Sequence, residues 1–78
     1  MKAQIYSYAV WIDKTEPKAL KEYFSLLLAK SGFEVLDLCE KHFEPYGYTA
    51  LFLLSESHLA IHTFPEHKET YIELSSCI

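Results

Sequence analysis

The spacing of apolar residues changes along the chain, and in its first part it predicts a strand followed by a helix. Residues 4–12 are rich in β-branched and aromatic side chains, which predicts a strand. From Leu20 to Leu28 the apolar residues recur at intervals of three and four, which predicts a helix with one apolar face forming core. Thr15 is the expected N-cap, and Gly32 is expected to end the helix in a left-handed conformation.

After the helix the spacing changes to two, as in strands that point alternate side chains to opposite faces. Four further strands are predicted, over residues 33–43, 48–54, 59–64 and 71–74. They are separated by turn-forming or polar segments, which are Pro45-Tyr46-Gly47, Ser55-Glu56-Ser57 and Pro65-Glu66-His67-Lys68. The pattern shows no internal repeat or linker.

One helix followed by turn-joined strands predicts an α+β fold, a two-layer α/β sandwich with an antiparallel sheet. The 78 residues make a single domain spanning 1–78. One helix cannot cover five strands, so either more chain after Ile78 or a second subunit is expected to supply the missing cover. A chain this short buries only about 60% of its unfolded surface, which also favours a partner.

Composition narrows the class of protein. Half of the residues are hydrophobic and 23% are charged, which excludes a disordered chain and a membrane protein. The net charge of -4 without a basic stripe gives no support to nucleic-acid binding. The N-terminal segment lacks the features of a signal peptide, so we expect a cytoplasmic protein with Cys39 and Cys77 as free thiols.

Residues able to do chemistry gather in the second half of the chain. They are Thr49, Glu56, Ser57, His58, His62 and Cys77. Side-chain alternation places Glu56, His58 and His62 on one face of an extended segment, and Ser57 on the other. Ser57 and His62 should therefore not meet within one strand unless a bend or a second subunit intervenes.

Two simpler interpretations of these residues stand beside a catalytic one. A serine between two strands is ordinarily a turn residue. A metal-binding module could use His58 and His62 with His42 or Cys39, although histidines four apart on a strand are poorly placed to hold one ion.

The run from Phe43 to Glu66, FEPYGYTALFLLSESHLAIHTFPE, resembles the pyruvoyl-dependent S-adenosylmethionine decarboxylase proenzymes of bacteria and archaea. The similar features are Glu-Ser-His-Leu, then Ile-His-Thr, an aromatic residue and Pro-Glu. Pro45-Tyr46-Gly47 upstream and Cys77 downstream stand at the family's spacing. The resemblance extends over nearly all of the chain.

The resemblance implies that the chain cleaves itself between Glu56 and Ser57. The serine hydroxyl would attack the carbonyl of Glu56, and β-elimination would then break the resulting ester. Residues 1–56 would become the β chain and residues 57–78 the α chain, with Ser57 converted to an N-terminal pyruvoyl group that acts as cofactor. No metal is implied.

The resemblance also assigns the other catalytic residues. His62 matches the histidine that assists the elimination, and Thr49 stands where the family usually has a serine that steadies the cleavage intermediate. Cys77 matches the cysteine that returns a proton to the substrate after carbon dioxide leaves, which suits a thiol with an ordinary pKa near 8.5.

The implied substrate is S-adenosylmethionine, and the product would serve spermidine synthesis. The candidate substrate-binding residues are Phe43, Tyr46, Glu56 and His58, with Tyr6, Tyr8 and Trp11 as further aromatic candidates. A homodimer or higher homo-oligomer is implied, in which Ser57 and Cys77 of one protomer face His62 and Thr49 of another.

The chain departs from the family pattern at both ends. Its opening strand lacks the usual histidine, and the family continues with a helix and a strand where this sequence ends at Ile78, so the fold is expected to lack that C-terminal segment. Three rival functions remain open: a paralogue that decarboxylates ornithine or arginine, a non-processing relative that acts as a binding or regulatory subunit, and the metal-binding module.

Overall fold

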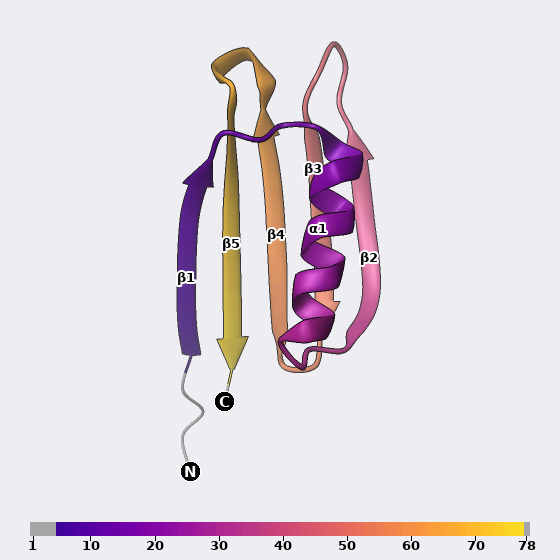
Figure 1. The fold of residues 1–78 in the computed structure, drawn as a ribbon, viewed down its shortest axis with the longest axis vertical. Helices are drawn as coiled ribbons and strands as arrows, with labels where there is room; N and C mark the ends of the chain where they lie inside the picture. Colours follow the sequence, from indigo (N-terminus) through magenta and orange to yellow (C-terminus); the bar gives the residue numbers. More distant parts are fainter. Residues whose placement is uncertain (1–4, 78) are drawn as a thin grey trace.

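The computed structural model describes residues 5–77, without the side chain of Cys77, and these residues form one helix and five strands (Figure 1). The elements are β1 (Ile5–Ile12), α1 (Pro17–Lys30), β2 (Val35–His42), β3 (Tyr48–Leu54), β4 (Ser57–Phe64), the 3-10 turn η1 (Pro65–His67) and β5 (Glu69–Cys77). The predicted order of strand, helix and four strands is confirmed.

The strands form one antiparallel sheet in the order β1-β5-β4-β3-β2, and α1 lies against one face of it (Figure 1). Strands β2 to β5 follow one another as neighbours joined by turns, whereas β1 pairs with β5 at the far edge. The predicted α+β fold with two layers and an antiparallel sheet is confirmed.

Side chains alternate between two faces of the sheet, here called the helix face and the bare face. The helix face holds the core, which is made of Leu20, Phe24 and Leu28 from α1 and Tyr48, Ala50, Phe52, Leu54, Leu59, Ile61 and Ile72 from the sheet. The bare face carries the intervening residues and has no described element over it (Figure 1). Burial of each large core side chain contributes about 1.5–3 kcal/mol, so folding depends mainly on the helix face.

The ends of α1 follow from its flanking residues. The N-cap is Glu16, whose carboxylate accepts a hydrogen bond from the amide of Ala19, so the prediction of Thr15 is wrong by one residue. Pro17 occupies the first turn, where its missing N–H costs nothing. At the C-terminus Gly32 has φ 86°, and the amide of Phe33 donates to the carbonyl of Leu28, as the sequence predicts for a glycine end.

Only part of the helix face is covered by α1. Beside it lies a groove of about 990 Å³, lined by apolar residues of α1, β1, β4 and β5. Tyr23 and Leu27 line this groove and remain 62% and 42% exposed, so the prediction that the whole apolar stripe of the helix is core is wrong for them. The reason is that no described element packs over that part of the sheet.

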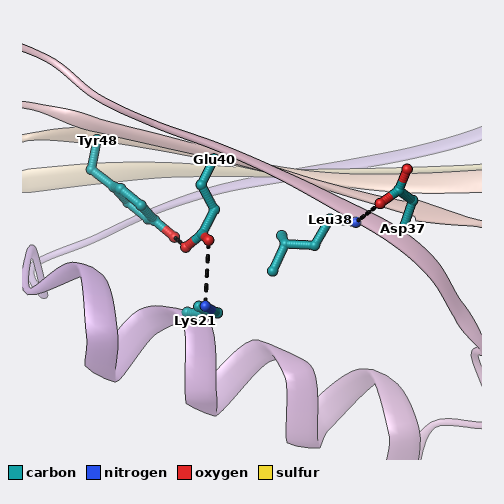
Figure 2. A network of polar contacts seen from close by, with 5 residues as sticks. All are labelled: Lys21, Asp37, Leu38, Glu40 and Tyr48. Atoms are coloured by element: carbon teal, nitrogen blue, oxygen red, sulfur yellow. Dashed lines mark hydrogen bonds and ion pairs between the residues drawn. The ribbon is translucent and has the colours of Figure 1, made fainter.

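Three strands have boundaries that differ from the predicted ones. β2 begins at Val35, and its pairing with β3 shifts register between Val35 and Asp37. The carboxylate of Asp37 accepts a hydrogen bond from the amide of Leu38 at 2.8 Å (Figure 2). β4 begins at Ser57, and β5 runs from Glu69 to Cys77. Pairing with neighbouring strands overrides the weak strand preference of these polar ends. The predicted first strand residue, Gln4, lies outside the described residues.

A polar contact ties α1 to the sheet (Figure 2). The hydroxyl of Tyr48 donates to Glu40 Oε1 at 2.6 Å, and Lys21 Nζ lies 3.3 Å from Glu40 Oε2. The hydrogen bond from Tyr48, with a smaller contribution from Lys21, lowers the pKa of Glu40 below 4.5. Burial and the same hydrogen bond raise the pKa of Tyr48 above its ordinary value of 10. The contact is therefore strongest at pH values where Glu40 is ionised and Tyr48 keeps its proton.

We predict that Tyr48→Phe lowers the free energy of unfolding by about 1 kcal/mol at pH 7, because Glu40 loses its hydrogen bond. Since the pKa of Glu40 is lowered in the folded chain, its stabilising effect is present above about pH 4.5 and is lost as the pH falls through the lowered value. Urea unfolding at pH 7 and pH 3 measures both effects. Tyr71→Phe is the matched control, because its hydroxyl bonds only Glu73 on the same strand. A Tyr48→Phe effect that is equal at both pH values would contradict the prediction.

Candidate active site

The Glu56–Ser57 peptide bond lies in the turn between β3 and β4. Leu54 and Ser57 pair directly across the hairpin, so Ser55 and Glu56 alone make the turn. Glu56 has φ 58°, a left-handed conformation that turns of this kind usually give to glycine or asparagine. A side chain in that region costs about 1–2 kcal/mol, so the turn is strained beside this bond.

Ser57 is the first residue of β4, and its side chain lies on the helix face. It is only 9% exposed. Its hydroxyl donates to the hydroxyl of Ser76 at 2.9 Å, and Ser76 is its directly paired residue on β5. On the other side it is paired with the buried Leu54. The hydroxyl is thus held within a largely apolar surrounding.

Thr49 and His62 meet on the bare face. They are paired residues of β3 and β4, and Thr49 Oγ1 lies 3.0 Å from His62 Nδ1. On the other side of His62, the ring of Tyr71 is roughly parallel to the imidazole, with centroids 6.5 Å apart. A hydrogen bond to Glu73 raises the pKa of Tyr71, so its hydroxyl stays protonated. The contact at Nδ1 therefore orients the imidazole, and Nε2 remains available to contact a second group.

The structure keeps Ser57 apart from His62, as side-chain alternation predicts. The two side chains lie on opposite faces of the sheet. They are also five positions apart on β4, about 16 Å at the usual rise of about 3.3 Å per residue. Thr49 shares the position of His62, so the predicted catalytic residues form two separate groups within one chain.

The predicted substrate-binding residues divide in the same way. Glu56 and His58 are exposed and stand beside Ser57 in sequence, with His58 on a shallow bare-face groove of about 360 Å³. Phe43 and Tyr46 are 48% and 53% exposed and lie in the turn before β3, at the opposite end of that strand. One chain therefore does not bring the four together.

The aromatic residues of β1 also separate by face. Trp11 pairs with Tyr71 and lies on the bare face, with ring centroids 5.1 Å apart and Phe64 5.8 Å away. Tyr8 lines the groove beside α1 on the helix face. Tyr6 belongs to the same face by alternation. Of the three, only Trp11 lies near His62.

Cys77 closes β5, where its backbone pairs with Ile5. The predicted role of its thiol concerns a side chain outside the described part of the structure. The backbone register nevertheless sets this position next to Ser76, and therefore at the same end of the sheet as Ser57.

Ser76 is the contact that sequence reasoning missed. The predicted last strand ended at Leu74, so Ser76 fell outside it. Extending the hairpin register from the turn at 65–68 would have paired position 76 with Ser57, because β4 and β5 are joined by that short turn.

Among the described side chains of residues 5–76, no group of three or more His, Cys, Asp or Glu is placed to hold a metal ion. His58 and His62 lie on the bare face four positions apart along β4. Neither His42 nor Cys39 joins them in such a group. The single helix in the described range is too short and too polar to cross a membrane.

Comparison with known proteins adds an independent finding. A family model described as S-adenosylmethionine decarboxylase matches residues 12–78. S-adenosylmethionine decarboxylase proenzyme 2 of Bacillus cereus is 53% identical over 47 residues, which are 60% of this chain and 38% of that protein. The S-adenosylmethionine decarboxylase proenzyme of Geobacillus kaustophilus is 44% identical over 48 residues, 62% of this chain and 39% of that protein. The matched part thus spans about two fifths of these curated relatives.

A solved structure has the same fold. The crystal structure of the adenosylmethionine decarboxylase from Aquifex aeolicus superposes with a TM-score of 0.74, covering 97% of this chain and 65% of that one at 22% identity. The predicted S-adenosylmethionine decarboxylase-like sandwich is confirmed by this match. Because the family model extends from Ile12 to Ile78, across most of the sheet and the whole helix, the chain belongs to the S-adenosylmethionine decarboxylase family.

Proposed function

We propose that this chain is a self-cleaving proenzyme, and that its mature form decarboxylates S-adenosylmethionine with a pyruvoyl group made from Ser57. The observation that carries the proposal is the Glu56–Ser57 bond, which combines a left-handed Glu56 with a buried, hydrogen-bonded serine hydroxyl. The family and the names of its relatives, which are proenzymes, support it.

In the first step Ser57 Oγ attacks the carbonyl carbon of Glu56 through a five-membered ring. The Oγ proton is lost, the C–N bond breaks, and the Ser57 nitrogen takes up a proton to become an amine. The product is an ester between Glu56 and the Ser57 side chain. Strain of about 1–2 kcal/mol at Glu56 raises the energy of the peptide and so favours its opening.

In the second step a base removes the α-hydrogen of Ser57 while the bond between Ser57 Cβ and Oγ breaks. Glu56 leaves as a carboxylate that keeps this oxygen. The remaining enamine becomes an imine, and one water hydrolyses it to ammonia and the pyruvoyl group. Residues 1–56 and 57–78 are then separate chains. This step acts on the α-hydrogen rather than the hydroxyl, so its base need not lie on the helix face.

His62 is the base in this proposal, and a second protomer supplies it. Within one chain His62 lies about 16 Å along β4 from Ser57. Each chain carries Ser57 at one end of the sheet and the Thr49–His62 pair toward the other. Two chains packed by their bare faces with opposed ends would bring the two groups together.

The bare face supports this homodimer by its exposed apolar residues. Leu51, Leu53, Phe64 and Trp11 lie on it and are 40–55% exposed. A 78-residue chain gains from covering such a surface, because its own core is small. Two-fold pairing would give two equivalent sites.

Thr49 selects the tautomer of His62. If Nδ1–H donates to the Thr49 hydroxyl, the lone pair lies on Nε2 and the imidazole can accept a proton there. A serine would provide the same contact. The extra methyl of threonine belongs to a half-buried residue on the bare face.

In the mature protein, a pyruvoyl group supplies an electron sink for the carbanion formed when carbon dioxide leaves. Cys77 is proposed to return the proton, from a position adjoining the Ser57–Ser76 pair. The substrate contacts are the predicted Phe43, Tyr46, Glu56 and His58, whose rings and carboxylate suit a sulfonium cation. The product would serve spermidine synthesis in the cytoplasm.

We predict that the freshly made chain converts to two fragments, residues 1–56 and 57–78, the second with a pyruvoyl terminus. Intact mass under denaturing conditions gives both masses, and Ser57→Ala should remain one chain. Release of carbon dioxide from S-adenosylmethionine, compared with ornithine and arginine, tests the substrate. A wild-type chain that stays uncut after warm incubation would exclude the active-enzyme proposal.

We predict that His62 acts between protomers. His62→Ala alone should remain uncut, and so should Ser57→Ala. When the two are unfolded together in equal amounts and refolded, about half of the His62→Ala chains should pair with a Ser57→Ala partner and be cut. Gel separation of isotopically marked chains measures this fraction. No cleavage in the mixture, with dimers present, would show that the base is not supplied in this way.

We predict that Thr49→Val slows cleavage by about tenfold or more, because it keeps the shape of threonine but removes the partner of Nδ1. Thr49→Ser should cleave at least as fast as the wild type. Rates come from the loss of uncut chain with time. Equal rates for Thr49→Val and Thr49→Ser would contradict a role for the hydroxyl.

A further inference from the structure

The Ser57 hydroxyl has one side-chain partner in the described structure, and it comes from a different strand. Ser76 stands opposite Ser57 in the β4–β5 register, and the two Oγ atoms are 2.9 Å apart. Ser57 is 9% exposed and Ser76 is half-buried, so water competes little for this contact. No buried side-chain N or O among the described residues lacks a partner, and for Ser57 that partner is Ser76.

We propose that Ser76 is a positioning residue for self-cleavage, which holds the Ser57 hydroxyl in the rotamer from which it attacks Glu56. This inference rests on the proposed function and adds a residue to it. A serine side chain has three staggered positions, and one hydrogen bond is enough to favour one of them several-fold.

The direction of the hydrogen bond matters for the chemistry. With Ser57 as donor, its hydrogen points across to β5 and away from the turn. The lone pairs of Ser57 Oγ are then left for the carbonyl carbon of Glu56, which precedes it in the chain. Ser76 does not need to act as a base in this arrangement, because it orients the Ser57 hydroxyl before that hydroxyl loses its proton.

The environment on either side strengthens the restraint. Leu54, the paired residue on β3, is 2% exposed and offers no polar atom to Ser57 on that side. Of the two residues paired directly with Ser57, only Ser76 carries a hydroxyl. Because β5 is held between β1 and β4, Ser76 is part of a paired strand rather than a mobile loop.

The test measures the first-order rate of cleavage in Ser76→Ala, expected to be about five- to tenfold slower than in the wild type. Ser76→Thr keeps the hydroxyl and should restore most of the rate. Ser75→Ala is the matched control, because Ser75 is the adjacent serine on β5 and pairs with His58 on the opposite face. Its rate should equal that of the wild type.

Two further readouts separate positioning from loss of fold. The melting temperatures of Ser76→Ala and Ser75→Ala should agree within a few degrees, and Ser76→Cys, which is closer in size, replaces Ser76→Ala if the alanine variant does not fold. Hydroxylamine cleaves esters, so it reports how much chain has completed the first step. Ser76→Ala should show less ester than the wild type at equal times.

The outcomes are distinct. An uncut wild-type chain would overturn the proposed function itself. A wild type that cleaves while Ser76→Ala matches or exceeds its rate would overturn only the role of Ser76. The same holds if Ser76→Ala accumulates ester, because the block would then lie in the elimination, or if Ser76→Thr fails to restore the rate while keeping the wild-type melting temperature.

Discussion

The register of the β3–β4 hairpin is the constraint on which the rest of the site depends. Leu54 pairs with Ser57 across a turn of two residues. This pairing determines on which face of the sheet each later side chain of β4 lies. Ser57 goes to the helix face and His62 to the bare face. A slip of one residue would exchange them and would also turn Leu59 and Ile61 out of the core, so the core itself holds the register.

This constraint separates two kinds of surface. The helix face buries the core and places the Ser57 hydroxyl beside it, where it must find a partner inside the protein. The bare face exposes apolar residues around the Thr49–His62 pair and lacks cover within the described chain. The groove beside α1 adds a second uncovered surface. Both surfaces therefore expose apolar side chains that the described residues of this chain leave uncovered.

Much of this could be predicted from the sequence, because the strongest signals are local. The apolar spacing predicted α1 and the strands, Gly32 predicted the end of the helix, and alternation predicted that Ser57 and His62 would part. The misses depend on pairing or burial, which are not local. Glu16 rather than Thr15 caps α1, Tyr23 and Leu27 stay exposed beside a groove, and Ser76 meets Ser57 only because β5 continues past Leu74.

The position of the strained bond bears on whether the two pieces would stay together under the proposed cleavage. β4 is paired along its length with β3 on one side and with β5 on the other. Breaking the chain between Glu56 and Ser57 removes only the covalent turn and leaves both ladders and the core contacts of Leu59 and Ile61 in place. It also releases Glu56 from its left-handed backbone. The bond is thus located where its loss would cost the fold little and would relieve the strain at Glu56.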